Sequence, residues 1–333
     1  MAVTLRDVAV HAGVSASAVS RAYTPGASVS AKTRAKVEAA AAELGYRPSI
    51  LASALSTGRT KLIGLVANNF HNPVFLEVFD SFTRALQKRA LRPLLVNLSD
   101  DMTRDAAVVL LHQYSVDGVV LASSTLPPTF PAAFEAAGLP VVHAFGRWSR
   151  SPAINVVGVD NRAAGRLAAR TLAARGYESA AFLGGPEEAT STQDRLSGFR
   201  EGLRDTGLAI GGVSFARSYS FESGRTEMTR LLGSGKPAEA YFCGDDILSI
   251  GAMSALKDAG LLVPEDVGVL GFNDMQMAGW SGIDLTTIRQ PFPEIIEASI
   301  DRMSDMLARP HEEPTARLFA CSVVERATLR PAH

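Results

Sequence analysis

The chain has 333 residues, of which 47% are hydrophobic and 20% charged, and these proportions are typical of a globular protein rather than a disordered one. A chain of this length exceeds one ordinary domain, so we expect two or three structural units. The net charge is −1, but residues 1–60 carry +4 and the remainder carries −5. A basic first segment indicates either contact with a polyanion or chance variation in composition.

Cysteine content and hydrophobic runs narrow the class of protein further. Cys243 and Cys321 are far apart and form neither a CxxC pair nor a zinc-binding spacing, which favours a reducing compartment. The first residues lack the basic region and apolar core of a secretory signal. No apolar run approaches the ~18 residues of a membrane span. We therefore expect a cytoplasmic protein.

The first 45 residues contain the pattern of three short amphipathic helices. Thr4 is a candidate cap for the first helix, and Gly13 is expected to end it. Ser15 is expected to cap the second helix, and a third is predicted to run from Ser30 to Gly45. Two short helices joined by a tight turn that contains glycine are typical of a helix-turn-helix.

A linker and an α/β pattern follow these helices. Residues 49–57 have helical spacing but span only about two turns, so we predict a helix that forms conditionally. From residue 61, strand-like apolar runs alternate with helix-like runs, from 61–68 and 73–90 to 249–260 and 266–272. This alternation implies mainly parallel sheets with helices on both faces. The number of strands favours two similar lobes with a cleft between them.

Motifs along the whole chain are similar to those of one known family. The first 60 residues contain "TLRDVAVHAGVSASAVSRAYT" and "LGYRP", and the remainder contains "IGLVANNFHNPVF", "VGVDNRAAGRLAARTL", "DRLSGFREGL" and "VPEDVGVLGFNDM". Taken in this order, they make the chain resemble the lac repressor/galactose repressor family of bacterial transcription regulators. The resemblance implies an N-terminal all-α helix-turn-helix head. It also implies an α/β core of two Rossmann-like lobes, similar to type I periplasmic binding proteins.

The resemblance also implies how the chain is divided. The helix-turn-helix domain is expected over residues 1–46, and the hinge helix and linker over 47–59. The N-terminal lobe of the core is expected to combine residues 60–160 with 291–318. The C-terminal lobe is expected to combine 161–290 with 319–333. Crossovers between the lobes are predicted near residues 158–162, 288–292 and 317–322.

Residues of the head and linker match positions that contact DNA in this family. The second helix of a helix-turn-helix reads base edges in the major groove. Arg21 and Ser17 are the candidates for base contact, and Leu55 falls where relatives insert a leucine between base pairs. Alternatively, Arg21 is an ordinary surface residue, and Leu55 and Tyr46 only pack. The implied DNA-contacting set is Thr4, Ser15, Ala16, Ser17, Ser20, Arg21, Ser30, Thr33, Tyr46, Arg47, Ala52 and Leu55.

Residues of the core match positions that contact a small effector between the lobes in this family. The guanidinium of Arg195 suits hydroxyls or a carboxylate. Alternatively, Tyr219 and Phe75 belong to the core, Asp245 caps a helix that begins near Ile247, and Asn273 is a turn residue. The implied effector-binding set is Asn68, Phe70, Asn72, Phe75, Arg195, Tyr219, Asp245, Asn273 and Gln290.

The function that the resemblance implies is a ligand-responsive repressor. It would bind a near-palindromic operator as a homodimer, and a sugar or sugar-like effector would alter formation of the hinge helix. Two other classes are disfavoured by the sequence. A periplasmic binding protein would carry a signal and no helix-turn-helix, and an enzyme would need a nucleophile, cofactor loop or metal cluster, none of which is predicted. The effector's identity, and whether it releases DNA or favours binding, stay open.

Overall fold

The computed structural model describes residues 3–24, 26–47, 58–68, 70–98, 102–127, 129–309 and 312–332. These residues form two compact units, Met1–Lys61 and Leu62–His333, which are described separately. The predicted linker at residues 49–57, with Ala52 and Leu55, lies outside the described residues. The first unit is therefore a small helical head and the second a larger α/β core.

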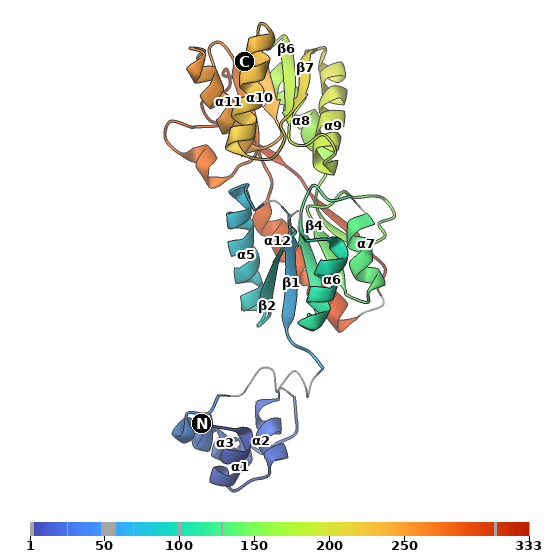
Figure 1. Cartoon of the computed structure of the whole chain (residues 1–333), viewed down its shortest axis with the longest axis vertical. Coiled ribbons are helices and arrows are strands. Elements are labelled where there is room, and N and C mark those ends of the chain that lie inside the picture. Colours follow the sequence, from blue (N-terminus) through green and yellow to red (C-terminus); the bar gives the residue numbers. More distant parts are fainter. Residues whose placement is uncertain are drawn as a thin grey trace. The chain divides into compact units, whose positions relative to one another are not determined.

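Three helices make up the head: α1 (Leu5–Ala12), α2 (Ala16–Tyr23) and α3 (Ala31–Leu44) (Figure 1). The side chains of Thr4, Ser15 and Ser30 each accept a backbone N–H at the start of one helix. Gly13 and Gly45 end α1 and α3 with φ of 63° and 66°, where a side chain would be strained. The predicted helices and caps are confirmed. A small buried core, which includes Val8, Val19, Val37, Ala40 and Ala41, holds the three helices together.

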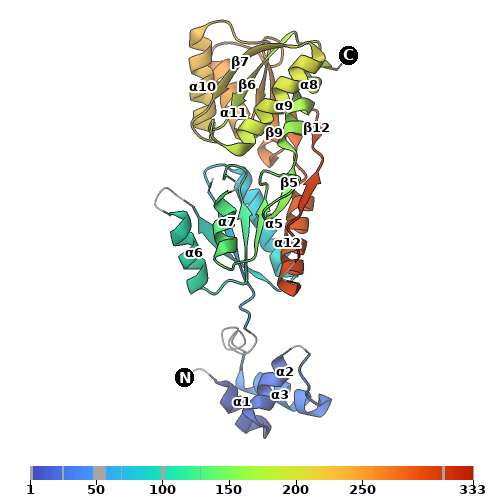
Figure 2. The ribbon, with the colours of Figure 1, turned by 90° about the vertical axis from the view of Figure 1, so that its right-hand side faces the viewer.

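The N-terminal lobe of the core contains a six-stranded sheet in the order β11-β5-β4-β3-β1-β2, and every pairing within it is parallel. Its helices α5 and α12 pack together on one face, and α6 and α7 pack together on the other (Figure 2). The strands are β1 (Leu62–Ala67), β2 (Arg92–Asn97), β3 (Gly118–Ala122), β4 (Val141–Ala144), β5 (Asn155–Val159) and β11 (Ala316–Phe319). The helices are α5 (Val74–Lys88), α6 (Arg104–Gln113), α7 (Thr129–Ala136) and α12 (Phe292–Ala308).

The C-terminal lobe repeats this plan with a sheet in the order β12-β10-β9-β8-β6-β7, in which only the β10–β12 pairing is antiparallel. The helix pairs α8–α9 and α10–α11 lie on opposite faces (Figure 2). The strands are β6 (Ser179–Gly184), β7 (Ala209–Phe215), β8 (Ala240–Cys243), β9 (Gly268–Asn273), β10 (Thr287–Arg289) and β12 (Ser322–Val324). The helices are α8 (Asn161–Ala173), α9 (Thr190–Thr206), α10 (Phe221–Ser234), α11 (Asp246–Asp258) and the short 3-10 helix η1 (Gln276–Gly279).

The chain passes between the two sheets three times: after β5, after β10, and between β11 and β12. Each lobe is therefore built from segments far apart in sequence. The two parallel sheets and the helix-turn-helix confirm the predicted fold class. Alternation alone did not predict α10, α12, β7, β10, β11 or β12, and it placed the starts of α9 and α11 about one turn too late.

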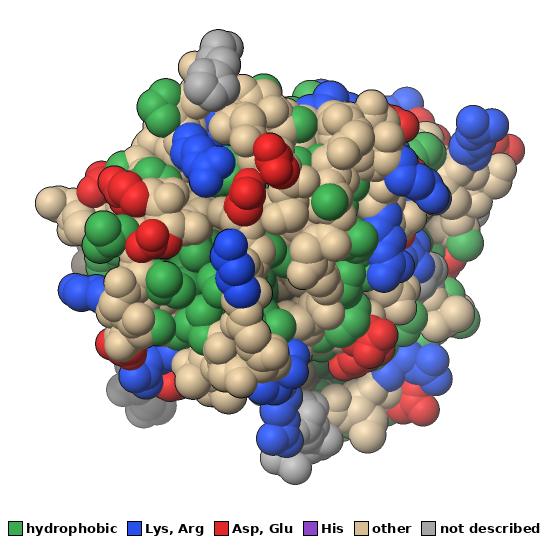
Figure 3. Space-filling view, turned by 90° about the horizontal axis from the view of Figure 1, so that it is seen from above, with side chains coloured by type: hydrophobic (Ala, Val, Ile, Leu, Met, Phe, Trp, Pro, Cys, Tyr) green, Lys and Arg blue, Asp and Glu red, His purple; other side chains and the backbone are tan. Residues whose placement is uncertain are grey.

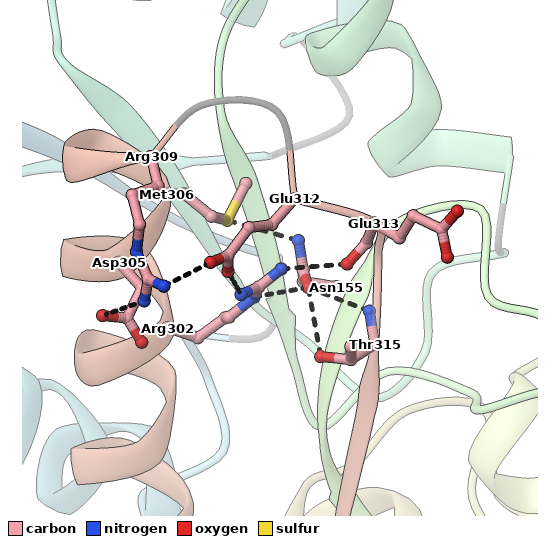
Figure 4. A network of polar contacts seen from close by, with 8 residues as sticks. All are labelled: Asn155, Arg302, Asp305, Met306, Arg309, Glu312, Glu313 and Thr315. Atoms are coloured by element: carbon pink, nitrogen blue, oxygen red, sulfur yellow. Dashed lines mark hydrogen bonds and ion pairs between the residues drawn. The ribbon is translucent and has the colours of Figure 1, made fainter.

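A polar network fixes the return of the chain from α12 to β11 (Figure 4). The buried Asn155, at the start of β5, accepts hydrogen bonds through Oδ1 from Arg302 Nε (2.7 Å) and from the backbone N–H of Thr315 (3.0 Å). Arg302 also forms an ion pair of 2.6 Å with Glu312. Because Asn155 contacts both α12 and the residue before β11, it sets where the edge strand enters the N-terminal sheet.

Positive and negative side chains are intermixed on the face of the molecule that Figure 3 shows. Several arginines of the C-terminal lobe are paired with acids, as in Arg225–Asp258 (2.8 Å) and Arg230–Glu227 (2.6 Å). A surface of this kind does not present the single sign of charge expected for contact with a polyanion.

Candidate functional site

Helix α2 presents a small exposed face on the side away from the core of the head. Val19 and Ala22 are buried, whereas Ala16, Ser17 and Arg21 are exposed. The Ser17 hydroxyl already bonds that of Ser15 at 3.0 Å. The side chain of Arg21 makes no hydrogen bond or ion pair with any other residue that the structure describes, so its guanidinium can contact a base or a phosphate.

The remaining DNA-contact candidates of the head differ in exposure. Thr4, Ser30 and Arg47 are exposed, and the hydroxyls of Ser30 and Thr33 lie 2.8 Å apart at the start of α3. Ser20 is half-buried beside the core. Tyr46 is also half-buried, and its ring centroid lies 6.2 Å from that of Tyr23. Tyr46 therefore packs within the head, as the alternative interpretation of the sequence expected.

A cavity lies between the two lobes of the core and leaves about 30 Å³ of space for the centres of water molecules. Seven of the nine effector candidates line it, whereas Asn68 and Phe70 do not. The sequence did not identify the other five lining residues, which supply mainly apolar surface from the N-terminal lobe. The full lining is Asn72, Val74, Phe75, Val78, Ser124, Phe145, Arg195, Tyr219, Asp245, Asn273, Gln290 and Phe292.

Asp245 is the centre of the polar wall of the cavity. Its Oδ1 accepts the backbone N–H of Ile247 (2.9 Å), which caps α11, so the predicted helix-capping role is present together with the place in the cavity. Its Oδ2 accepts Nδ2–H bonds from Asn72 (2.7 Å) and Asn273 (2.9 Å), and Gln290 Nε2 donates to Asn273 Oδ1 (2.6 Å). Burial raises the pKa of the Asp245 carboxyl to about 6, against the stabilising effect of these donors.

Asn273 adopts a backbone conformation that is rare for a residue with a side chain. Its φ is 120°, in the region that favours glycine. The hydrogen bonds to Asp245 and from Gln290 hold the side chain while the backbone turns out of β9. Strained residues of this kind persist where the surroundings over-determine them, and they are often found at ligand sites. Asn273 is thus both the turn residue and the cavity residue that the sequence offered as alternatives.

Arg195 is buried in α9 and is held in place by the C-terminal lobe itself. Its Nε donates to Asn161 Oδ1 (2.9 Å), its Nη1 donates to the carbonyl oxygen of Gly244 (2.5 Å), and its guanidinium lies 3.7 Å from the centroid of the Phe272 ring. Burial lowers the pKa of Arg195. The guanidinium is therefore oriented before any ligand enters, which reduces the entropy lost on binding.

Aromatic side chains form much of the remaining wall. Tyr219 is 5% exposed, and its hydroxyl lies 2.7 Å from that of Thr192 in the first turn of α9. Phe145 and Phe292, from the N-terminal lobe, meet edge to face with ring centroids 5.6 Å apart. Phe75 is packed against the core and also lines the cavity. Tyr219 and Phe75 are therefore core residues that also line the cavity, and their contact with a ligand stays a prediction.

Asn68 and Phe70 lie in the loop after β1 but point elsewhere. Asn68 Nδ2 donates to Thr125 Oγ1 (2.8 Å), and its Oδ1 accepts from Ser123 Oγ (2.8 Å). The Phe70 ring packs against that of Phe79, with centroids 4.8 Å apart. Neither residue belongs to the cavity wall, so their contact with an effector stays a prediction. Their neighbour Asn69 lies outside the described residues.

Two histidines of the N-terminal lobe, His71 and His143, do not belong to the cavity wall. His71 is exposed, and His143 is buried with Nε2 2.8 Å from the carbonyl oxygen of Ser123. Burial lowers the pKa of His143 to about 4, so its ring is neutral near pH 7. No group of three metal-ligating side chains is found among the described residues. In the same part of the chain, no helix is long and apolar enough to cross a membrane.

We predict that Asp246 makes the stability of the core depend on pH. Asp246 is fully buried, accepting from Thr287 Oγ1 (2.5 Å) and the N–H of Met275 (2.8 Å), and burial raises its pKa to about 7. Between the unfolded pKa near 4 and this value, the folded state holds a proton that the unfolded state has lost. The free energy of unfolding should therefore fall with rising pH, by about 1.4 kcal/mol per unit for this group.

Urea unfolding of the wild type, Asp246→Asn and Asp205→Asn at pH 5, 6, 7 and 8 tests this dependence. Asp205 is exposed, so its substitution should keep the wild-type slope. Asp246→Asn should flatten the decline between pH 5 and 7, whatever its effect on absolute stability. A wild-type slope in the Asp246→Asn protein would contradict the assignment.

Two family models match the chain. Residues 4–49 match the bacterial regulatory proteins of the lacI family, and residues 169–329 match a periplasmic binding protein-like domain. The first match covers the head, and the second covers most of the C-terminal lobe together with α12 and β11 of the N-terminal lobe. Their order along the chain agrees with the fold.

Relatives extend the similarity to the full length. The HTH-type transcriptional repressor CytR of Escherichia coli (strain K12) is 30% identical over 332 residues, which cover 99% of this chain and 97% of that protein. The HTH-type transcriptional repressor PurR of Klebsiella pneumoniae subsp. pneumoniae is 29% identical, covering 98% of this chain and 96% of that one. Both relatives are named as repressors rather than enzymes.

Solved structures give the same result. The lac repressor dimer bound to operator and the anti-inducer ONPF has a TM-score of 0.87 at 28% identity and covers 98% of this chain and 99% of its own. The complex of the transcriptional regulator CelR with cellobiose has a TM-score of 0.74 at 27% identity, with the same coverage. With this fold, these family matches and a repressor 30% identical over nearly its whole length, the chain belongs to the lacI family of bacterial regulatory proteins.

Proposed function

We propose that this protein is a repressor that binds a near-palindromic operator as a homodimer and responds to a sugar or sugar-like effector in the interlobe cavity. The observation that carries the proposal is the convergence of polar side chains from both lobes on Asp245, in a chain that begins with a helix-turn-helix. Two structural neighbours support it. One was solved with operator and an anti-inducer, and the other with cellobiose.

The two walls of the cavity suit a ring with one polar edge and one apolar face. Asp245, Asn273 and Arg195 offer acceptors and donors from the C-terminal lobe. Phe75 and Phe145 offer apolar surface from the N-terminal lobe. Small-molecule sites combine a mainly apolar lining with a few polar groups that fix orientation. A sugar ring matches this division, since its hydroxyls lie around the edge and its C–H groups on the faces.

The proposed mechanism is a shift between two arrangements of the lobes. An effector that binds one arrangement more tightly shifts the population toward it. The linker that includes residues 49–57 precedes β1, so a change at the base of the N-terminal lobe would alter how two linkers of a dimer approach DNA. The minor-groove roles of Ala52 and Leu55 in this step rest on the family resemblance alone. Release of DNA and enhanced binding both fit this scheme.

The division of labour along the chain is also a proposal. We assign DNA reading to residues 1–46 and the hinge to 47–59. Effector binding is assigned to one lobe of residues 60–160 with 291–318 and another of 161–290 with 319–333. Within the head, Arg21 and Ser17 are proposed to contact bases. Thr4, Ser15, Ala16, Ser20, Ser30, Thr33, Tyr46 and Arg47 are proposed to complete the DNA contacts.

The homodimer is proposed to form along α5 and β2 of the N-terminal lobe. Leu76 on α5 is 76% exposed, and Leu95 on β2, the edge strand of its sheet, is 50% exposed. Exposed apolar side chains on neighbouring elements are typical of association surfaces.

Leu76→Arg is expected to convert a dimer into a monomer at micromolar concentration, measured by sedimentation velocity. Val109→Arg, on α6 at the opposite face, is the matched control, and its 55% exposed side chain should be dispensable. A Leu76→Arg protein that sediments as a dimer would place the interface elsewhere.

A thermal-shift screen of the purified protein tests the effector proposal. The compounds are sugars, sugar phosphates, polyols and nucleobases. A compound that binds only the folded state should raise the melting temperature as its concentration rises. A hit among the sugars would support the proposed class. A silent screen from a protein that still binds DNA would contradict it and direct attention to other ligands or to a protein partner.

A further inference from the structure

Hydrogen bonds and an ion pair join the two lobes at one side of the cavity. Arg147, which follows β4 in the N-terminal lobe, donates from Nε to Asp194 Oδ2 (2.7 Å) and from Nη2 to Asp194 Oδ1 (2.8 Å) and the carbonyl oxygen of Thr190 (3.0 Å). In return, Thr190 Oγ1 (3.0 Å) and the N–H of Ser191 (3.2 Å) donate to the carbonyl oxygen of Ser124. We call Ser124, Arg147, Thr190, Ser191 and Asp194 the interlobe clasp.

A second set of contacts joins the lobes elsewhere around the cavity. Glu77 on α5 accepts the N–H of Gln276 at the start of η1 (2.8 Å), and Asn72 donates to Asp245 across the cavity (2.7 Å). In Figure 1, α5 lies on the left of the core and α9, which carries the clasp residues of the C-terminal lobe, lies on the right. The lobes are therefore held together on both sides of the cavity.

The cavity between these contacts is too small for the proposed effector. The 30 Å³ open to the centres of water molecules hold about two waters, far less than the volume of a sugar ring. The polar wall of the C-terminal lobe cannot easily make room, because Arg195 and Asp245 are bonded within their own lobe. Asn72 also occupies Asp245 Oδ2, which an effector hydroxyl would use. Space must come from parting the lobes.

The clasp and the effector wall share residues 190–195 at the start of α9. Asp194, which binds Arg147, directly precedes Arg195, whose guanidinium lines the cavity. Thr192, two residues before Asp194, bonds the hydroxyl of Tyr219 on the same wall. The interlobe clasp and the effector wall therefore both depend on the position of the same segment of α9.

From these contacts we propose that the interlobe clasp holds the core in a closed state that excludes the effector, and that the effector binds by selecting the state with the clasp broken. This proposal rests on the proposed function and specifies how that site is regulated. The apparent affinity for an effector falls in proportion to the fraction of molecules in the competent state. Arg147 is thus a positioning residue that sets this fraction without touching the effector.

The geometry of the clasp distinguishes it from an ordinary surface ion pair. Arg147 and Asp194 make two parallel bonds, and their side chains are only 32% and 22% exposed. By contrast, Arg84 and Asp80 pair within one turn of α5 at 73% and 57% exposure, joining nothing beyond that helix. Arg150 lies three residues after Arg147, is exposed, and has no ion pair among the described residues. It provides a control in the same loop.

Amide hydrogen exchange of the full-length protein without any ligand tests the clasp. The N–H of Gln276 in the C-terminal lobe donates to Glu77 in the N-terminal lobe, on the side away from Arg147, so its exchange reports on parting of the lobes rather than on local loosening. Arg147→Ala and Asp194→Asn should each speed exchange at Gln276 and Ser191 by about three- to tenfold. Arg150→Ala should change neither. Amides of β1, an interior strand of the N-terminal sheet, should keep wild-type rates in all variants.

The reversed pair Arg147→Asp with Asp194→Arg should recover part of the protection at Gln276, because it restores the charge pairing. Wild-type exchange at Gln276 in Arg147→Ala would overturn the proposal. Faster exchange spread equally over β1 would also overturn it, since it would mean general destabilisation. Because no ligand is used, these results are independent of the effector screen, and a failure of either proposal can be recognised separately.

Discussion

Replacing Arg21 with alanine is expected to weaken binding to the selected operator by about ten- to hundredfold, and binding to unrelated duplex DNA by much less. Arg21 is the exposed cation of α2, and Ala16 and Ser17 offer little reach toward base edges. A bidentate contact to guanine is worth about 1–3 kcal/mol of discrimination, whereas a phosphate contact affects all sequences alike. The operator is first obtained by selecting bound sequences from a randomised library, and affinities are then measured at fixed salt.

The comparison of two duplexes provides the internal control for Arg21. Equal losses on operator and unrelated DNA would make Arg21 a phosphate contact and would leave base reading to smaller side chains. Arg200→Ala removes the same charge from an exposed position of the core and should change neither affinity. Arg21 is not part of the buried cluster of the head, so the Arg21→Ala head should still fold. Circular dichroism of the variant checks this.

Replacing Arg195 with alanine is expected to abolish the response to effector, because the dissociation constant of the effector should rise by about a hundredfold or more. The substitution also removes donors from Asn161 Oδ1 and from the carbonyl oxygen of Gly244, both buried in the C-terminal lobe. The free energy of unfolding should therefore fall by about 2–4 kcal/mol. Melting temperatures with and without the compound found by screening measure both effects at once.

Two further variants separate the effector contact of Arg195 from its structural role. Tyr219→Phe removes one hydroxyl from the same wall and keeps the ring. It should therefore lower the affinity for the effector with little loss in the free energy of unfolding. Arg200→Ala lies on the same helix as Arg195 and should match the wild type in both measurements. Undiminished effector affinity in Arg195→Ala would remove this residue from the site.

The head could be predicted from local signals, because its helices begin and end at residues with specific backbone chemistry. Ser15 and Ser30 cap helices through their hydroxyls, and Gly13 and Gly45 adopt positive φ. The α/β core was predictable for a similar reason. Its strands are continuous apolar runs, which follow from burial of a parallel sheet on both faces.

The parts that sequence reasoning missed depend on contacts between distant segments. The first turn of α9 consists of small polar residues, and its Thr190 and Thr192 bond Ser124 and Tyr219 rather than an apolar face. Such a turn lacks the apolar periodicity by which helices are recognised. In the same way, Phe145 and Phe292 have no local signal for a place in the cavity. Arg147 and Asp194 are 47 residues apart, and nothing in the sequence pairs them.

The candidate site was predictable mainly as a set of residue types, through the family resemblance. From the sequence, Asp245 could be assigned to a helix cap or to the cavity. The structure shows that Oδ1 caps α11 while Oδ2 accepts from Asn72 in the cavity wall. Asn68 and Phe70 were assigned together with Asn72, but the loop turns only Asn72 toward the cavity. Side-chain direction in a loop depends on bonds such as Asn68–Thr125, which cross 57 residues.

If one cavity ligand controls operator binding, the two binding events are linked, and we would measure that linkage first. The affinity of the full-length protein for the selected operator is measured with and without a saturating amount of the compound found by screening. We expect operator affinity to change by about tenfold or more in either direction, and the affinity for the compound to change equally when operator is added. A compound that binds the core while operator affinity stays constant would show that the cavity does not control DNA binding.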